Sequence, residues 1–401
     1  MPRRGLLGAV VFAVVAALGV GSCGGQARRL APRDSPRPAP RGSPALFNRE
    51  TYAYHETHLP YGAEANRYQF LVLEETAGWR VRFLHRANPH LKILLYQDPL
   101  VSKGHTTQTT CTSYTYDAAH DPGWFLANRQ RRPIIVGPNN YLMNVGNPTY
   151  QRVCMANATA LAKRFGFDGL FFDGVAPALA DAGIPAAGNP PEYSTVPAWQ
   201  AAMYSMLSYA YRVAHDRGLL VIGNIGAAVG TPGLWQHWNT VLDGAEEEAW
   251  TDGGLGRAQQ VPYWVAKLAN VAWSEAHRKY ALVHSYNGTR AGNAYGLASM
   301  LLVAGGYSSY STSNTNLTSD EAWYPEYTTA QALGSPSGSY EQLGNGVYKR
   351  TFASGIVLVN PTAHSAPRFS LGPGAYSAPG LDRVRSVAMG PTSGLILLGA
   401  R

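Results

Sequence analysis

Cysteine is scarce in this chain, which has only three among 401 residues: Cys23, Cys111 and Cys154. An odd number in an exported protein requires an explanation. If Cys23 carries a lipid, Cys111 and Cys154 remain as an even pair, and an oxidising compartment favours a disulfide between them. A zinc site made of two cysteines and distant histidines is the weaker alternative, because His-Glu-Thr-His at 55–58 lacks the HExxH spacing. We therefore predict a disulfide, no metal and no cofactor.

The chain also lacks an apolar run that would span a bilayer comfortably. Its longest candidate, 6–20, has 15 residues and follows Arg3 and Arg4, as is typical of a secretory signal. Val-Gly-Ser-Cys at 20–23 resembles a bacterial lipobox, in which Cys23 would be acylated. We predict a signal peptide over 1–23 and an extracytoplasmic protein, either lipid-anchored to the bacterial membrane or secreted without lipid.

A basic surplus is missing from the body of the chain, although the formal net charge is +8. Seven arginines and one aspartate lie in 1–41 and account for six of those eight charges. No basic groove is left for a nucleic acid, so we expect no nucleic-acid partner and no membrane contact beyond the lipid. The segment 24–45 is rich in Pro, Arg, Ala and Ser without hydrophobic periodicity, which predicts a disordered tether.

From about residue 46, strand-like segments alternate with helical ones such as 151–165 and 197–217. Eight strands are predicted, at 51–55, 69–73, 92–97, 169–173, 219–224, 241–246, 280–284 and 307–310. This number of strand–helix units predicts an α/β fold, a (β/α)₈ TIM barrel over 46–338. Short strands separated by Gly, Pro and Ser follow, and they predict a small antiparallel β domain over 339–401.

One pattern occurs twice, 75 residues apart: Asp-Gly-Leu-Phe-Phe-Asp at 168–173 and Asp-Gly-Ala-Glu-Glu-Glu at 243–248. Because side chains alternate along a strand, Asp173 and Glu248 would occupy equivalent places at the carboxyl ends of two strands. Active sites of parallel barrels lie at that end, and glycoside hydrolysis requires two facing carboxylates. The alternative is that both acids are solvated loop starts or helix caps.

Four segments, in their order and spacing, resemble a known family. They are Asp-Gly-Leu-Phe-Phe-Asp-Gly-Val at 168–175, Asp-Gly-x-x-x-Glu at 243–248, Tyr-Gln-Asp-Pro at 96–99 and Gly-Ile-Val-Leu-Val-Asn-Pro at 355–361. The chain resembles hypothetical glycosyl hydrolase family 15 over about 47–400, a group related to α-galactosidase-like barrels and to endo-α-1,4-polygalactosaminidases.

The resemblance implies catalytic roles for the two acids. In the related barrels a carboxylate after the fourth strand is the nucleophile or base, and one after the sixth is the general acid. By our strand order these are Asp173 and Glu248. The run Glu246-Glu247-Glu248 departs from the family pattern, in which apolar residues precede the acid. Glu246 is therefore an alternative on the same face, whereas Glu247 should face the helices and need a partner there.

Further residues at strand ends are candidates for binding the substrate. Asp98 could hold sugar hydroxyls or merely cap its loop, and Asn224 could bind a hydroxyl or tie loops together. The remaining candidates are His55 and Tyr286, at the ends of the first and seventh strands, together with Glu246 and Trp250. A lone Trp is more often part of the core than a platform for a sugar ring.

Together these observations favour an extracytoplasmic glycoside hydrolase that cleaves a polysaccharide or oligosaccharide by acid/base catalysis with two carboxylates. A non-catalytic glycan-binding surface lipoprotein on the same fold is the alternative, since a fold does not guarantee activity. A metal-dependent deacetylase is disfavoured, because the sequence has no convincing set of His and Asp ligands.

Overall fold

The structure is a computed structural model that describes residues 48–51, 61–103, 111, 123–136, 140–181, 190–251, 261–286, 289–312 and 323–400. The predicted signal peptide and tether, with Cys23, lie outside the described residues, as does His55. No helix within the described part of the chain is both long enough and apolar enough to cross a membrane.

Eight strands pair side by side in one sheet, and every pairing is parallel. The first and last of them lie next to each other, so the sheet nearly closes into a barrel. In sheet order the strands are β1 (Asn48–Thr51), β2 (Phe70–Leu73), β3 (Lys92–Gln97), β7 (Gly169–Phe172), β8 (Leu220–Asn224), β9 (Gly244–Glu247), β10 (Tyr280–Ser285) and β11 (Ser308–Thr312). The predicted TIM-barrel class is confirmed.

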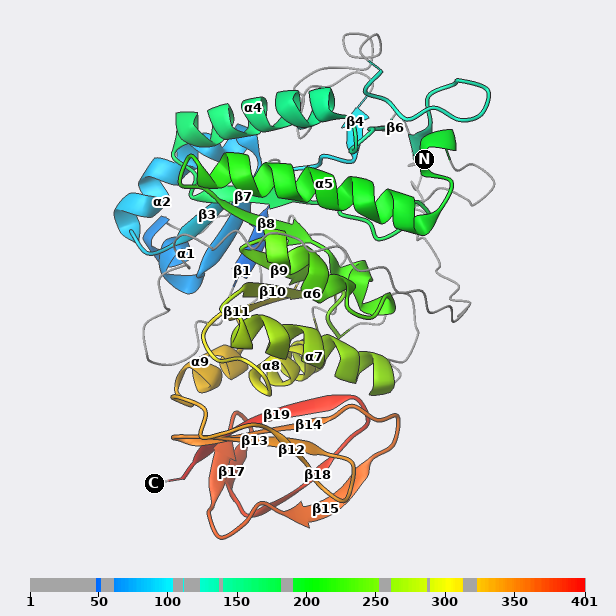
Figure 1. The fold of residues 1–401 in the computed structure, drawn as a ribbon. Helices are drawn as coiled ribbons and strands as arrows, with labels where there is room; N and C mark the ends of the chain where they lie inside the picture. Colours follow the sequence, from blue (N-terminus) through cyan, green and yellow to red (C-terminus); the bar gives the residue numbers. More distant parts are fainter. Residues whose placement is uncertain are drawn as a thin grey trace, which may run out of the picture.

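Helices connect these strands and cover the outside of the barrel (Figure 1). The α-helices are α1 (Tyr61–Arg67), α2 (Val81–Ala87), α4 (Pro148–Phe165), α5 (Val196–His215), α6 (Leu234–Trp238), α7 (Val261–Ala276), α8 (Arg290–Leu301) and α9 (Pro325–Gln331). Short 3₁₀ helices occur at η1 (Glu75–Arg80), η3 (Pro191–Tyr193), η4 (Gly226–Gly230) and η5 (Asn239–Val241). The two clearest predicted helices, 151–165 and 197–217, correspond to α4 and α5.

Two strand predictions are displaced. The first strand lies at Asn48–Thr51 rather than 51–55, and the sixth begins at Gly244 rather than at 241 because Asn239–Val241 forms a 3₁₀ turn. The other six barrel strands agree with their predicted ranges to within two residues at each end. The displacement does not change the strand order, so the fourth and sixth strands are those that precede Asp173 and Glu248.

The inside of the barrel is filled by side chains from alternate positions of its strands. Phe171 of β7 lies level with Tyr96 of β3 and Ile222 of β8 in the strand register, and all three are buried in this inner cluster. Phe172, the next residue, belongs instead to the outer core between sheet and helices. Asp173 lies two residues beyond Phe171 and therefore continues the inner face.

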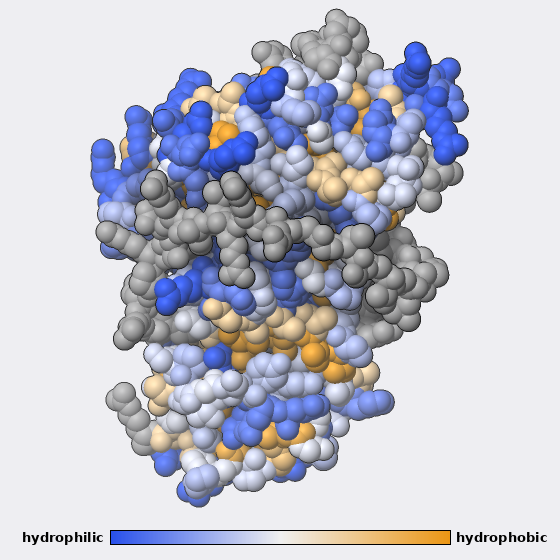
Figure 2. Space-filling view, viewed as in Figure 1, coloured by the Kyte–Doolittle hydropathy of each residue, from blue (hydrophilic) through white to orange (hydrophobic). Residues whose placement is uncertain are grey.

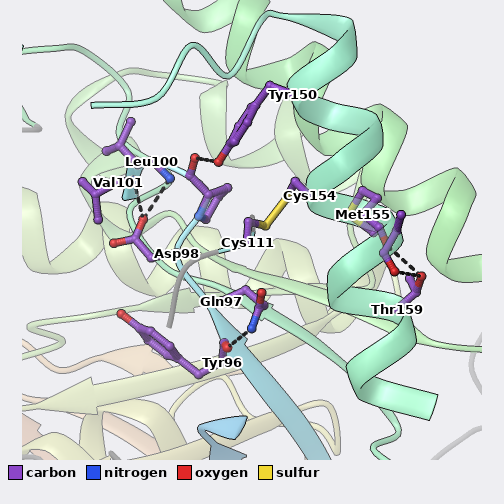
Figure 3. Close-up of a disulfide and its surroundings, with 12 residues drawn as sticks. Tyr96, Gln97, Asp98, Leu100, Val101, Cys111, Tyr150, Cys154, Met155 and Thr159 are labelled. Atoms are coloured by element: carbon purple, nitrogen blue, oxygen red, sulfur yellow. Dashed lines mark hydrogen bonds between the residues drawn. A yellow bond between two sulfur atoms is a disulfide. The ribbon is translucent and has the colours of Figure 1, made fainter. Parts of the chain in front are cut away.

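A long excursion follows β3 and carries its own small sheet of β4 (Val101–Lys103), β6 (Asn140–Leu142) and β5 (Ile135–Val136). Cys111 of this excursion is bonded to Cys154 of α4, and both are fully buried (Figure 3). The predicted disulfide is confirmed. It closes a separation of 43 residues, which stabilises the fold by about 4 kcal/mol in the chain-entropy treatment.

The C-terminal part forms two antiparallel sheets. The larger contains β12 (Glu341–Gln342), β13 (Tyr348–Phe352), β14 (Gly355–Asn360), β19 (Ser393–Gly399), β16 (Tyr376–Ala378) and β17 (Leu381–Val384), and the smaller pairs β15 (Ala366–Ser370) with β18 (Ser386–Met389). The predicted antiparallel fold of this region is confirmed.

This C-terminal region packs against the barrel helices α7, α8 and α9, which lie between it and the barrel strands in Figure 1. Arg350 of β13 donates to the carbonyls of Leu301 and Ala304, at 2.9 and 2.7 Å. A Cβ at Gly394 would lie 2.6 Å from the carbonyl oxygen of Ala294, so β19 touches the backbone of α8 directly. Figure 2 shows apolar surface gathered over these helices just above the sheets.

Candidate active site

Asp173 and Glu248 stand at the carboxyl ends of β7 and β9, with β8 between them. Asn224, the last residue of β8, joins them: its Nδ2 donates to Asp173 Oδ1 at 3.0 Å and to Glu248 Oε2 at 2.7 Å. All three side chains are partly exposed. The structure thus brings together the two predicted acids and one predicted binding residue.

The shared amide limits how far apart the two acids are. Since one nitrogen bonds both oxygens, these oxygens are separated by no more than the two hydrogen bonds laid end to end, about 5.7 Å. Retaining glycosidases hold their carboxyl groups about 5 Å apart, and inverting ones hold them roughly 6.5–9.5 Å apart to admit a water. The limit applies to the nearest oxygens of the two carboxylates, and it brings the pair within the range of separations that glycosidases use.

Two tyrosines and one backbone N–H, that of Gly174 at 2.8 Å from Asp173 Oδ1, also contact the two acids. Tyr286, a predicted site residue that follows β10, donates its hydroxyl to Glu248 Oε1. Tyr96 of β3 donates its hydroxyl to Asp173 Oδ2 at 2.5 Å. This role of Tyr96 was not identified from the sequence. The available signal was its spacing, because Tyr96 lies two residues before Asp98 and so shares a face of the predicted strand with it.

The three consecutive glutamates after Ala245 have three different environments. Glu246 points into the barrel and is 1% exposed, level with Asn224 in the register. Glu247 points outward, as predicted, and pairs with Lys267 of α7 at 3.0 Å. Burial raises the pKa of Glu247 to about 7, while the Lys267 ammonium opposes that rise. Glu248 is the one of the three glutamates that is partly exposed, and it accepts hydrogen bonds from Asn224 and Tyr286. This favours Glu248 over the buried Glu246 as the acid.

His284 of β10 is a further neighbour that sequence reasoning missed. Its ring packs edge-on against Tyr286, with centroids 4.8 Å apart, and its Nδ1 lies 2.6 Å from the hydroxyl of Ser311. Burial lowers the pKa of His284 to about 3, so the imidazole is neutral at ordinary pH. It therefore packs beside Tyr286 as an uncharged group.

Two other predicted site residues have different surroundings. Asp98 Oδ1 accepts from the backbone N–H groups of Leu100 and Val101, at 2.9 and 3.3 Å, which is the loop-capping alternative (Figure 3). Trp250 is fully buried, and its indole N–H donates to the Gly296 carbonyl at 2.9 Å. Trp250 is therefore a core residue bonded to the backbone of α8, the alternative expected for a lone Trp, rather than a binding residue.

The repeated Asp-Gly pairs lie at the opposite end of the barrel. Asp168 Oδ2 accepts from the Ile93 N–H at 2.8 Å and lies 2.9 Å from His85 Nε2. Asp243 Oδ2 repeats the arrangement with the Val221 N–H, at 2.8 Å, and with His215 Nε2, at 2.9 Å.

The glycines of these pairs match as well. A Cβ on Gly169 would lie 2.6 Å from the carbonyl oxygen of Leu220, and one on Gly244 would lie 2.4 Å from that of Tyr280. In each pair the aspartate bonds the strand on one side, and the glycine allows the strand on the other side to approach closely. The role of both Asp-Gly pairs is therefore structural.

A metal centre has no candidate ligands here: within the ranges that the structure describes, no three His, Cys, Asp or Glu side chains are grouped so that they could hold an ion. Asp173 and Glu248 accept hydrogen bonds from an amide side chain, two phenols and the Gly174 N–H, and such donors suit carboxylates rather than a cation.

The family model for hypothetical glycosyl hydrolase family 15 matches residues 85–356. The chain belongs to this family. Membership confirms the resemblance seen in the sequence and makes the protein a glycosidase. No curated protein matches the chain.

Several solved glycoside hydrolases are similar in structure to parts of this family 15 protein. The glycoside hydrolase domain of PelA from Pseudomonas aeruginosa is 17% identical, with 66% of this chain and 94% of that one covered and a TM-score of 0.45. Ega3 from Aspergillus fumigatus, solved with galactosamine, is 13% identical, with 73% and 98% covered and a TM-score of 0.46. A maltogenic α-amylase, AmyB from Thermotoga neapolitana, is 10% identical, with 89% and 99% covered and a TM-score of 0.53. The likeness to the α-amylase, whose TM-score exceeds 0.5, concerns the fold alone at this identity.

Proposed function

We propose that this glycosidase cleaves a polysaccharide or oligosaccharide outside the cytoplasm, with Asp173 as nucleophile and Glu248 as general acid and base. The observation that carries the proposal is the Asn224 amide that bridges the two carboxylates. This close approach supports a pair that acts on one glycosidic bond, at the end of the barrel where such sites lie, and the mechanism proposed for it is the retaining one.

In the first step Glu248, protonated, gives its proton to the glycosidic oxygen, and a carboxylate oxygen of Asp173 attacks the anomeric carbon. The bond between that carbon and the glycosidic oxygen breaks, and the leaving sugar departs as an alcohol. In the second step Glu248, now a carboxylate, takes a proton from water while the water oxygen attacks the anomeric carbon. Asp173 is released, and the configuration at the anomeric carbon is retained.

The neighbouring groups hold the two acids for these steps. Tyr96 and Asn224 donate to different oxygens of Asp173, which fixes the rotation of the carboxylate. Asn224 and Tyr286 do the same for Glu248. Because all these donors come from the ends of rigid barrel strands or the residue that follows one, the nucleophile and the acid keep their separation before substrate arrives.

The location outside the cytoplasm rests on the N-terminal sequence. The basic and apolar segment that ends in Val-Gly-Ser-Cys at 20–23 supports export, with a lipid on Cys23 and the segment 24–45 as a tether between membrane and barrel. Metabolic labelling with a fatty-acid analogue tests the lipid: label should be incorporated into the expressed protein and lost in Cys23→Ser.

Activity is tested with para-nitrophenyl α- and β-glycosides of glucose, galactose, galactosamine and N-acetylgalactosamine, and NMR of the first product assigns its anomeric configuration. We expect at least one glycoside to be cleaved with retention, and Glu248→Gln to slow phenyl glycosides far more than dinitrophenyl ones, since dinitrophenolate leaves without a proton. Cleavage with inversion, or equal losses on both leaving groups, would contradict the assignment.

A further inference from the structure

The turn that follows Glu248 is held from behind by a buried lysine. Lys267 of α7 is 2% exposed, and its Nζ donates to the Ala249 carbonyl at 2.5 Å and approaches the Trp250 carbonyl at 3.4 Å. The same ammonium pairs with Glu247 at 3.0 Å. One cation therefore contacts the residue before Glu248 and both residues after it.

The backbone at this point needs such support. Ala249 has φ of +57°, in the left-handed region that costs a non-glycine residue energy and that persists only when its surroundings impose it. The ammonium accepts no hydrogen bond and donates only, so it is suited to two inward-turned carbonyls and a carboxylate. Without it, the Ala249 carbonyl would be left without this buried donor.

Glu248 is also confined on its other side. A Cβ on Gly226, at the start of η4, would lie 2.8 Å from the Glu248 backbone nitrogen, so the two loops touch. Trp250 is fixed in the core by its indole bond to Gly296 and by its backbone bond to the His284 carbonyl, at 2.7 Å. Between these two fixed points, the Ala249 turn decides where the Glu248 carboxyl points.

We infer that Lys267 is a positioning residue for the general acid: its ammonium holds the Ala249 turn so that Glu248 faces Asp173 and Asn224. Lys267 reaches the site only through the backbone and never touches substrate. The inference rests on the proposed function, since it takes Glu248 to be the acid. The role of Glu247 is to hold this buried side chain in place through their ion pair.

The test compares kcat/KM for a phenyl glycoside and a dinitrophenyl glycoside of whichever sugar the wild type cleaves. Lys267→Met should lower the phenyl value about 100-fold, as a misplacement of about 1 Å does, while the dinitrophenyl value falls by less than about 3-fold because that leaving group needs no proton. A structural role alone would lower both values equally.

Lys267→Met leaves Glu247 buried without its cation and can fail to fold. The double variant Lys267→Met with Glu247→Leu replaces the pair by apolar side chains and keeps the test available. The matched control is Lys279→Met, because Lys279 Nζ donates to the Leu242 carbonyl, two residues before the start of β9 and away from the acid. This control should retain wild-type kcat/KM on both glycosides.

A folded double variant with the wild-type phenyl value would overturn the inference, and so would equal losses on the two glycosides. These outcomes differ from a failure of the proposed function. If Glu248→Gln itself hydrolyses both glycosides like the wild type, then Glu248 is not the acid and the proposed function fails.

Discussion

At the N-terminal end of the barrel, Asp168 and Asp243 each accept a backbone N–H of the neighbouring strand and contact a histidine from a helix. At the C-terminal end, Asp173 and Glu248 are bonded by the side chains of Tyr96, Asn224 and Tyr286. Asp168 and Asp243 directly precede β7 and β9, and Asp173 and Glu248 directly follow the same two strands.

The partners explain why only one end is suited to chemistry. A carboxylate bonded to a strand N–H is part of the sheet, and moving it would leave a backbone donor unpaired. Asp173 also accepts one backbone N–H, from Gly174 at 2.8 Å, but this donor belongs to the turn after β7 and not to a strand pairing. The other donors named for Asp173 and Glu248 are side chains, which can adjust as charge moves to the substrate. The difference predicts that substitutions at one end reduce activity and at the other reduce stability.

The largest effect is expected at the catalytic end. Asp173→Asn and Glu248→Gln should each lower kcat/KM on a phenyl glycoside by about 100- to 10,000-fold, because each removes a covalent or proton-transfer role. Thermal unfolding should change little, since the replacements keep the size of each side chain. A folded Asp173→Asn variant with wild-type kcat/KM would remove Asp173 from the mechanism.

Asn224→Ala tests the bridge between the two acids. Losing the shared amide leaves Asp173 and Glu248 facing each other without a donor between them, so both orientation and spacing relax. We expect kcat to fall about 100-fold, the scale of a misplaced catalytic group. Asn224→Asp adds a third negative charge to the site and should be no better than Asn224→Ala. Wild-type kcat in both variants would show that the bridge has no role.

The structural end should respond in stability instead. Asp243 is 3% exposed, so Asp243→Ala leaves the Val221 N–H unpaired and should lower the free energy of unfolding by about 1–3 kcal/mol. The Asp168 side chain is 26% exposed, and water can replace it, so Asp168→Ala should cost less. Urea unfolding measures both, and kcat per folded molecule should remain that of the wild type. A fall in kcat without a loss of stability would reverse the assignment of the two ends.

His284 predicts a pH dependence of stability. Its pKa is about 3 when folded, below the unfolded value of about 6.5, so the unfolded chain binds more protons between these values. The stabilising contribution is complete above about pH 6.5 and is lost as the pH falls toward 3, by about 1.4 kcal/mol per pH unit. Glu247 has the opposite effect, because its pKa is raised on folding: its contribution to stability is lost as the pH rises from about 4.5 to 7.

The His284 contribution is isolated by comparing the urea unfolding of wild type and His284→Asn between pH 3 and 7. The difference in stability in favour of the wild type should shrink as the pH falls. A difference that stays constant over this range would show that the imidazole is not held neutral by burial.

Much of the fold was predictable because barrel strands have local signals. The apolar run 92–97 and the segment 280–284 locate strands by composition alone, and alternation placed Glu247 toward the helices, where Lys267 meets it. The order of the strands then places Asp173 and Glu248 at one end of the barrel.

Other features depend on side chains that meet only in three dimensions. The bond from Tyr96 to Asp173 joins residues 77 positions apart and requires the register of β3 against β7. The burial of Trp250 depends on helix α8, which begins 40 positions later in the chain. The Asp-Gly pairs marked the strands correctly, yet their own role depends on histidines from helices far along the chain.

The most direct test of the central claim is to identify the carboxylate that becomes covalently glycosylated. The enzyme would be treated with an activated fluorinated glycoside of a sugar that the wild type cleaves, digested, and analysed by tandem mass spectrometry. The account predicts a single glycosyl ester on Asp173, and none on Glu248, Glu246 or Asp98. A glycosyl ester on one of those three residues would contradict it.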